Sequence, residues 1–492
     1  MTTDQASPAT TASRTTEQDM PPGSQRVINL LLIAAFVVIL NETIMSVALP
    51  RLMVDLDITT STAQWLTTGF MLTMAVVIPA TGFILQRFHL RPVFITAMTL
   101  FSIGTFVAAM APGFGVLLTG RVLQASGTAI MMPLLMTTVL NLVPASKRGR
   151  TMGTISIVMA VAPAIGPTMS GLILSVLDWR WMFWIVLPIA LIALALGALM
   201  VKNVTTPRKV AFDAASVILS AFAFGGLIYG LASIGESAEG NAAVPVWVPL
   251  VVGVLALALF IVRQISLQRT NSALMDLRTF TTSAFTIAIV LIAISMMALF
   301  GSLILLPLYL QNVLELSTLT TGLMLLPGGV AMAIIGPIVG RLFDRFGPRP
   351  LVIPGAVVLS AALWSLTALG TETSIGLVIV IHVVMSAGIA FMLTPLLTTA
   401  LGSLKKDLYS HGSAIVGTVQ QLAGAAGTAL FITVMTTQIA ARIGEGAAEV
   451  SATAEGVQAA FMYGAVISIL GIIVSFFVKR PANALAAGTV IH

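Results

Sequence analysis

The heptapeptide LTTGFML, residues 66–72, recurs as LTTGLML at residues 319–325 with a single substitution. Two longer pairs follow in the same order along the chain: GFILQRFHLRP (82–92) with GRLFDRFGPRP (340–350), and RVLQASGTAIMMPLLMTTVL (121–140) with HVVMSAGIAFMLTPLLTTAL (382–401). Apolar sequences can resemble one another through composition alone, but these pairs also share glycine, proline and polar positions. The chain is therefore predicted to contain two copies of one unit.

The composition is that of a membrane protein. Of the 492 residues, 58% are hydrophobic and 9% are charged, whereas a soluble domain is about one quarter charged. Apolar stretches of ~20 residues, the length that crosses a hydrocarbon core, recur along most of the chain. The absence of cysteine excludes disulfides and thiolate metal sites, and with only four histidines no metal site is expected. We predict an all-α polytopic membrane protein.

Fourteen transmembrane helices are predicted, arranged as two six-helix halves plus two extra helices between them. The predicted spans are 27–49, 64–86, 93–111, 114–142, 149–176, 180–202, 214–234, 244–264, 281–311, 318–340, 350–369, 374–402, 412–436 and 457–478. The predicted organisation is a disordered cytoplasmic tail (1–26), an N-terminal half (27–202), two inserted spans with their linkers (203–280), a C-terminal half (281–480) and a cytoplasmic tail (481–492).

Lysine and arginine set the orientation. With both termini in the cytoplasm, the basic residues fall in segments on the inner side, except for Arg51, Arg121, Arg180 and Arg442. Such an excess of positive charge in cytoplasmic loops is the usual determinant of membrane topology. The net charge of +6 is thereby explained by topology, and no nucleic-acid partner is expected.

Five motifs stand out within or beside the predicted spans: LNETIMSVALP (40–50), GRVLQASGTA (120–129), VAPAIGPTMSGL (161–172), DWRWMFWI (178–185) and QQLAGAAGTAL (420–430). They resemble motifs of the fourteen-span drug:proton antiporters of the major facilitator superfamily, and within that family the lincomycin and multidrug exporters look closest. The resemblance covers residues 27–480. It implies the major facilitator fold, in which parallel repeats enclose a substrate site near the bilayer midplane.

Glu42 is the only acidic residue placed well inside a span, and Arg121 is the only basic one. Counted from the outer ends of their helices, Glu42 lies ~12 Å and Arg121 ~10 Å deep. An isolated charge in hydrocarbon costs several kcal/mol, so such residues are usually functional. We interpret Glu42 and Arg121 as the proton-coupling pair, with Glu42 as the proton carrier. The alternative is a permanent ion pair that joins the two helices.

In the family that the motifs resemble, an aspartate usually stands where this chain has Asn41. The acid is therefore displaced by one residue, or ~100° around the helix. Polar and sulfur-containing side chains near the two charges are predicted to line the substrate cavity, although helix packing is the alternative role for each of them. These are Asn41, Met45, Gln124, Thr128, Met131, Met132, His382, Gln420 and Gln421.

Two further sets of residues are predicted to act in conformational change. The antiporter motif, consisting of Gly166, Pro167, Ser170 and Gly171, lets one helix bend and a neighbour approach closely, although ordinary small-residue packing is the alternative. In the family, cytoplasmic loops between helices form charge latches, for which solvated turns are the alternative. The corresponding residues are Gly82, Gln86, Arg87 and Arg91 in the first copy, and Asp344, Arg345, Gly347 and Arg349 in the second.

These features predict a transporter in a bacterial cytoplasmic membrane that exports amphipathic, drug-like molecules in exchange for protons. No chemical reaction on the substrate and no cofactor is expected, because the proton gradient would drive transport. We expect a monomer embedded in the lipid bilayer. One alternative is a proton-coupled importer or facilitator of a specific nutrient, and another is a membrane sensor or scaffold that transports nothing.

Overall fold

The computed structural model describes residues 23–58, 60–203, 213–238, 244–270 and 272–479, together with Met20 and Pro207. Most of the predicted N-terminal tail and all of the segment 481–492 lie outside these residues. The described part contains fourteen α-helices long and apolar enough to cross a membrane and contains no strand, as predicted. The helices are α1 (Ser24–Asp55), α2 (Thr60–Arg87), α3 (Leu90–Ala109), α4 (Phe114–Leu142), α5 (Arg148–Val176), α6 (Trp181–Met200), α7 (Ala214–Ala238), α8 (Trp247–Gln268), α9 (Ser283–Asn312), α10 (Thr318–Phe346), α11 (Arg349–Leu366), α12 (Ile375–Gly402), α13 (Tyr409–Gly444) and α14 (Glu449–Ser475). Three short 3-10 helices lie between them: η1 (Ala145–Lys147), η2 (Leu277–Thr281) and η3 (Lys406–Leu408).

Several helices extend beyond the predicted spans. α13 begins at Tyr409 and ends at Gly444, whereas the prediction was 412–436, and α14 begins at Glu449 rather than near residue 457. Hydropathy identifies only the part of a helix that lies in hydrocarbon. The backbone hydrogen bonds of a helix can continue into the polar interface, where water satisfies the exposed end.

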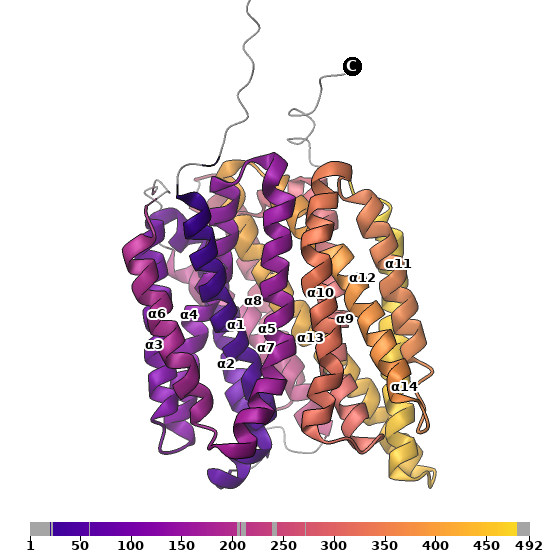
Figure 1. The fold of residues 1–492 in the computed structure, drawn as a ribbon. Coiled ribbons are helices and arrows are strands. Elements are labelled where there is room, and N and C mark those ends of the chain that lie inside the picture. The colour runs from indigo at the N-terminus through magenta and orange to yellow at the C-terminus, as the bar shows by residue number, and fades with distance from the viewer. Residues whose placement is uncertain are drawn as a thin grey trace, which may run out of the picture.

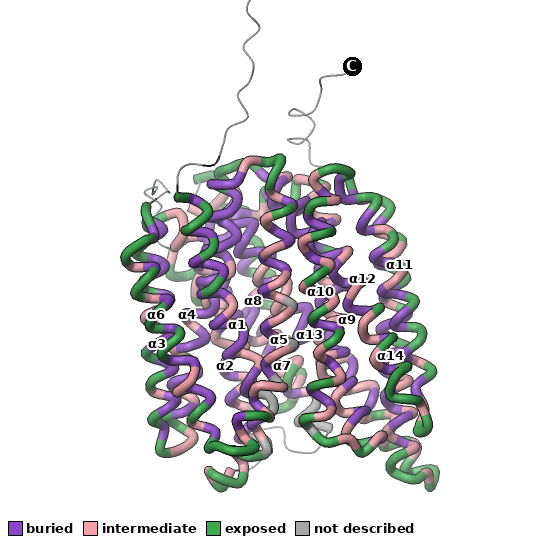
Figure 2. Tube along the Cα trace, in the orientation of Figure 1, coloured by how far each residue is buried: buried purple, intermediate pink, exposed green. Residues whose placement is uncertain are grey.

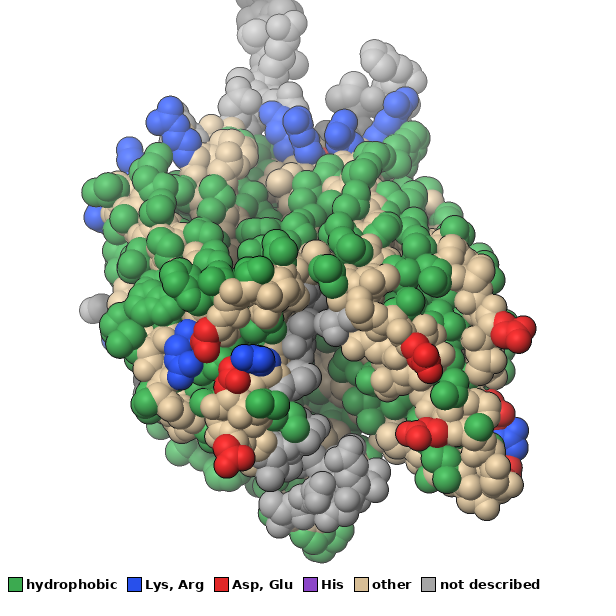
Figure 3. Space-filling view, turned by 60° about the horizontal axis from the view of Figure 1, so that its bottom comes forward, with side chains coloured by type: hydrophobic (Ala, Val, Ile, Leu, Met, Phe, Trp, Pro, Cys, Tyr) green, Lys and Arg blue, Asp and Glu red, His purple; other side chains and the backbone are tan. Residues whose placement is uncertain are grey.

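The helices form two groups that follow the duplication. In Figure 1 the N-terminal half (indigo to magenta) and the C-terminal half (orange to yellow) stand side by side. Because the number of spans is even, α1 begins and α14 ends at the same end of the molecule, at the top of this view. Lysine and arginine side chains gather at that end in Figure 3, which agrees with a cytoplasmic location.

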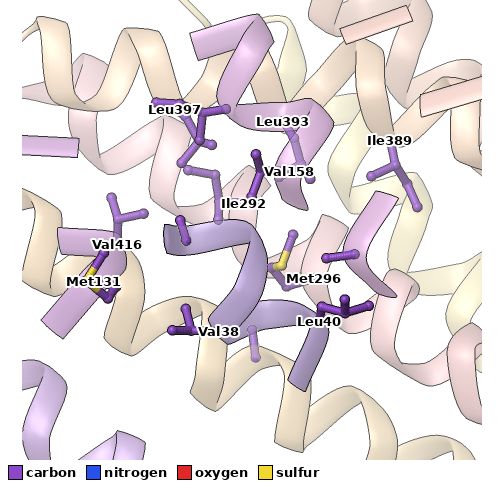
Figure 4. Close-up of a cluster of buried hydrophobic side chains, with 14 of the residues drawn as sticks. Val38, Leu40, Met131, Val158, Ile292, Met296, Ile389, Leu393, Leu397 and Val416 are labelled. Atoms are coloured by element: carbon purple, nitrogen blue, oxygen red, sulfur yellow. The ribbon is translucent and has the colours of Figure 1, made fainter. Parts of the chain in front are cut away.

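Most of the described interior is one large cluster of buried hydrophobic side chains from both halves, with two small clusters beside it. Figure 4 shows part of it, where Val38, Met131 and Val158 of the first half lie among Ile292, Leu397 and others of the second. The exposed residues lie mainly on the outer helix faces and at the helix ends (Figure 2). The outer faces carry many large apolar side chains, as expected for a surface in contact with lipid.

Close backbone packing joins α5 and α10 across the boundary between the halves. A Cβ atom on Gly340 would lie 2.3 Å from the carbonyl oxygen of Gly149, and one on Gly153 would lie 2.6 Å from that of Gly336. Only glycine permits this approach, which brings the cytoplasmic ends of the two helices into direct contact. The opposite, outer face is hollowed between the halves (Figure 3).

The inserted helices α7 and α8 form a hairpin at the edge of this boundary. α7 packs against α2, α13 and α8, and Trp65 of α2 stacks on Tyr229 of α7 with ring centroids 5.5 Å apart. At the cytoplasmic end of the hairpin, Arg263 donates two hydrogen bonds of 2.8 and 2.9 Å to the carboxylate of Asp213. The Arg263 guanidinium, with help from the Ser216 hydroxyl, lowers the pKa of Asp213 to about 2.

We expect Asp213→Asn to lower the thermal stability of the purified protein at neutral pH, because the substitution removes the ion pair. The pKa of Asp213 in the folded protein lies below its ordinary value near 3.8. The ion pair therefore contributes fully to the stability of the protein above about pH 5, and this contribution is lost as the pH falls towards 2. The difference in Tm between wild type and variant should therefore narrow over that range.

The matched control is Asp55→Asn, which removes the exposed ion pair between Arg51 and Asp55 on a single helix. Exposed pairs of this kind contribute at most about 1 kcal/mol. An equal loss of Tm in both variants would contradict a special role for the Asp213–Arg263 pair.

Candidate functional site

A cavity of about 180 Å³ lies between the two halves. Four helices of the first half (α1, α2, α4 and α5) and four of the second (α9, α10, α12 and α13) contribute to its wall. Each set consists of the first, second, fourth and fifth helices of the duplicated unit, so the cavity follows from the internal repeat.

The structure is closed on the cytoplasmic side by hydrogen bonds that join the two halves. They link Ser156 to Thr394 (2.7 Å) and Thr137 to Ser413 (3.2 Å).

Most of the wall is apolar and flexible. Five methionines contribute to it, three from the first half and two from the second: Met74, Met132, Met159, Met296 and Met332. Phe300, Leu303 and Leu393 add further apolar surface. Thioether side chains are polarizable and adopt many rotamers, so a wall of this kind can adapt to ligands of different shape.

Glu42 is the only acidic side chain among the described residues that line the cavity. Its carboxylate makes no hydrogen bond or ion pair with another described residue, and it is accessible from the cavity. No ion pair joins it to Arg121 among the described residues. The permanent ion pair considered from the sequence is therefore not formed in this structure.

Arg121 is held instead by neutral groups. Its guanidinium donates hydrogen bonds to Asn41 Oδ1 (3.2 Å), Gln124 Oε1 (3.2 Å) and the Leu66 carbonyl oxygen (3.4 Å). The ring of Phe70 covers it, with its centroid 4.1 Å from Cζ. With 1% of its surface exposed, Arg121 is a buried cation whose nearest acid is in the cavity wall.

The structure divides the residues predicted to line the cavity into two groups. Thr128, Met132, His382, Gln420 and Gln421 line it. Asn41, Met45, Gln124 and Met131 do not line it and are buried in the packed interior.

The physical reason is the rotation of each helix. Because successive residues point about 100° apart, Asn41 faces α4 when Glu42 faces the cavity, and only one of Met131 and Met132 can face it. Gln124 is turned towards α3, where its amide donates to the Thr105 hydroxyl at 2.9 Å.

His382 occupies the position in the second copy that Arg121 occupies in the first. Its Nε2 atom lies 3.3 Å from the Leu325 carbonyl oxygen on α10, and its Nδ1 atom is buried and finds no hydrogen-bond partner among the described residues. Gly328 makes room for the ring, because a Cβ atom there would lie within 2.5 Å of it. In the first half Arg121 joins α4 to α2, and in the second half His382 joins α12 to α10. Each side chain contacts a backbone carbonyl oxygen of the other helix.

The antiporter motif lies on the side of α5 that packs on α1. A Cβ atom on Gly166 would clash with the Thr43 hydroxyl, which itself donates to the Ala162 carbonyl oxygen at 3.3 Å. Ser170 is buried and donates to Met182 Sδ on α6, whereas Gly171 has open space beside it. The side chain of Pro167 lies outside the described residues. Gly166 thus permits a close helix contact directly beside Glu42.

Both predicted latch loops reach the opposite half. The Gln86 amide donates to Ser410 Oγ on α13 (3.0 Å) and lies 2.5 Å from His411 Nε2. In the second copy, Asp344 accepts hydrogen bonds from the backbone N–H groups of Gly149 (2.8 Å) and Arg150 (2.9 Å) at the start of α5.

The other predicted latch residues lie beside these contacts. In the first turn of α3, the Arg91 backbone N–H donates to the side chain of Asn203, which follows α6. In the second loop, Gly347 ends α10 with a positive φ of 81°, and Arg345 stacks on Phe346. Arg349 is exposed at the start of α11. Arg87 follows Gln86 at the end of α2, and Gly82 lies one turn before it.

One residue at this end had no sequence signal that singled it out. His411 is 7% exposed and contacts both Gln86 and the Leu274 carbonyl oxygen. It has no histidine counterpart in the first copy, and a single histidine near a helix start resembles an interfacial residue.

The family model described as Major Facilitator Superfamily matches residues 31–428. The lincomycin resistance protein LmrB of Listeria monocytogenes is 43% identical over 92% of this chain and 96% of its own length. The uncharacterized MFS-type transporter YcnB of Bacillus subtilis is 42% identical over 95% of this chain and 98% of its own length. The structure of the human organic anion transporter MFSD10 has the same fold, with a TM-score of 0.65 at 15% identity over 92% of this chain and 100% of that one.

We expect Asn41→Leu to lower the free energy of unfolding by about 1.5–3 kcal/mol, the range for a hydrogen bond to a charged group. The substitution leaves the buried Arg121 guanidinium without its acceptor on α1, whereas Asn41→Asp supplies a carboxylate at the same place and should retain stability. Thermal unfolding of the purified variants in detergent measures both. An unchanged Tm for Asn41→Leu would mean that the Arg121–Asn41 bond contributes nothing to folding.

Proposed function

The chain belongs to the Major Facilitator Superfamily, and from this premise we propose that it exports amphipathic small molecules in exchange for protons. It is a multi-pass protein of a bacterial cell membrane, in a family of transporters rather than enzymes. The observation that carries the proposal is the place of Glu42, a carboxylic acid in the wall of the cavity between the two halves. The export of lincomycin-like antibiotics is supported by the name of the LmrB relative.

The conformation of the structure suits the step in which substrate is released to the outside. The cytoplasmic side is closed by contacts between the halves, and the outer face is hollowed. In the proposed cycle a proton reaches Glu42 from outside, the substrate leaves, and the halves rock so that the cavity opens to the cytoplasm. There the proton is released and the next substrate molecule binds.

Glu42 can exchange a proton because two opposing effects act on the balance between its acid and carboxylate forms. Burial favours the neutral acid, and the nearby positive charge of Arg121 favours the carboxylate. Because Arg121 is held by Asn41, Gln124 and a backbone carbonyl, its position does not depend on the charge of Glu42. The carboxylate is then free to gain and lose a proton without breaking a structural bond.

The cavity also suits the proposed substrates. Its methionine side chains and Phe300 would contact the apolar part of a drug, while polar groups of the drug could bond to Thr128, Gln420, Gln421 and His382. No cofactor is required, since the proton gradient supplies the energy, and a single chain contains both halves of the cavity.

Drug-evoked proton movement in inside-out membrane vesicles with an acidic interior tests the proposal. Addition of lincomycin should release protons from wild-type vesicles, because each exchanged drug molecule requires proton efflux. Glu42→Gln should abolish this release while it still binds the drug, because a glutamine carries no exchangeable proton at that position.

The control is Glu372→Gln, which changes an exposed glutamate of the outer loop before α12 and should leave the release unchanged. Unchanged coupling in Glu42→Gln would make Glu42 a structural residue. If a panel of antibiotics evoked no proton release even in wild type, the nutrient importer would become the better explanation.

A further inference from the structure

The inserted hairpin occupies the seam between the two halves. α7 packs against α2 of the first half and α13 of the second, while α8 packs chiefly against α7. In Figure 1 the two helices lie at the back of the view, between the halves. On this side the hairpin is therefore in contact with both parts that must separate when the cytoplasmic end opens.

The segment that follows α8 crosses the same seam. We call residues 272–278 the strap. Leu274 and Met275 are 2% and 4% exposed, so the middle of the strap is buried although it contains no regular structure before η2 begins at Leu277. Its backbone is bound on two sides: the Met275 N–H donates to Gln264 Oε1 of α8 (3.1 Å), and the Leu274 carbonyl oxygen accepts from His411 Nδ1 of α13 (3.2 Å).

α2 lies against the same point of the strap. A Cβ atom on Gly82 would lie 3.2 Å from the Leu274 carbonyl oxygen and 3.4 Å from His411 Nδ1. Because a carbonyl oxygen can only accept, His411 Nδ1 carries the hydrogen, and its Nε2 atom accepts from the Gln86 amide of α2. His411 is thus a junction at which α2, α13 and the strap meet.

The strap is anchored firmly at its other side. The Gln264 amide donates to the Ser216 hydroxyl (2.7 Å), which donates to Asp213 (2.5 Å). Asp213 in turn pairs with Arg263, so a continuous set of hydrogen bonds runs from α7 through α8 to the strap. Within the strap, the buried Asp276 carboxylate pairs with Arg278 at 2.5 Å. Opening of the cytoplasmic end must separate α2 from α13, which requires that the contacts of Gln86 with Ser410 and His411 break and that Gly82 moves away from the Leu274 carbonyl oxygen.

We propose that the α7–α8 hairpin and the strap form a clasp that holds α2 and α13 together at the cytoplasmic end and thereby favours the state open to the outside. The clasp gives the two inserted helices a role in the conformational cycle. It rests on the rocking of the two halves in the proposed function but not on the identity of the proton carrier.

The accessibility of one introduced thiol tests the clasp, and the absence of cysteine makes that thiol the only one in the chain. Ser413 is a suitable reporter, because it is 3% exposed and bonded across the seam to Thr137. In inside-out vesicles, a membrane-impermeant maleimide reaches Ser413→Cys only when the cytoplasmic end opens. The rate of labelling, measured without substrate or gradient, reports the population of the open end.

In this background Gln264→Leu removes the acceptor that holds the strap, and we expect labelling to become about fivefold faster, the effect of one lost buried hydrogen bond. The matched control is Gln268→Leu, one turn further along α8, where the amide nitrogen has no hydrogen-bond partner in the described structure. It should leave the rate unchanged.

Gly82→Ala provides an independent variant, because its methyl group presses on the Leu274 carbonyl oxygen and should also accelerate labelling. If Gln264→Leu does not yield a monodisperse protein, the labelling rate of Gly82→Ala tests the clasp instead. Labelling of both folded variants at the control rate, or more slowly, would overturn the clasp. Because no transport is measured, failure of the clasp is distinct from failure of proton exchange at Glu42.

Discussion

A guanidinium group that is buried inside a membrane protein must find its hydrogen-bond acceptors on neighbouring helices, because neither water nor lipid supplies them. Arg121 finds them on α1, on α2 and one turn along its own helix α4. These contacts set the rotation of α1 relative to α4, since Asn41 must point at the arginine. The next residue, Glu42, is then turned into the cavity. One buried cation therefore determines where the single acid of the cavity wall is presented.

The second half repeats the geometry with different chemistry. His382 stands where the repeat places Arg121, and it also reaches a backbone carbonyl on the second helix of its own half. The hydrogen bond is retained, but the permanent charge is not. As a consequence the two walls of the cavity are unequal: the first carries the carboxylic acid of Glu42 with Arg121 buried behind it, and the second offers histidine and amide side chains. A duplicated scaffold can keep its helix packing while the chemistry of its halves diverges.

Closure of the cytoplasmic end uses two different kinds of contact on the two sides of the molecule. Between α5 and α10 it depends on glycine, which allows backbone to meet backbone, and on Asp344 at the start of α5. Between α2 and α13 it depends on side chains, with Gln86 and His411 at the centre. Side-chain hydrogen bonds of this kind can break and re-form without loss of helix packing, which suits a seam that must open.

The number of spans, their order, the duplication and the cytoplasmic side could be predicted from the sequence, because span length, apolar content and the bias of lysine and arginine act locally along the chain. The sequence also identified Glu42 and Arg121, since isolated charges are conspicuous in apolar helices. The side chains near these two charges that face the cavity could not be predicted in the same way, because their direction depends on how the helices pack. Asn41, Met45, Gln124 and Met131 are buried in packed interfaces, while Met132 and Thr128 line the wall. A rotation of one residue moves a side chain by about 100°, and that rotation is set by packing between helices distant in sequence. The junction at His411 escaped the sequence for the same reason, because Gln86, Leu274 and His411 meet only when α2, the strap and α13 are assembled.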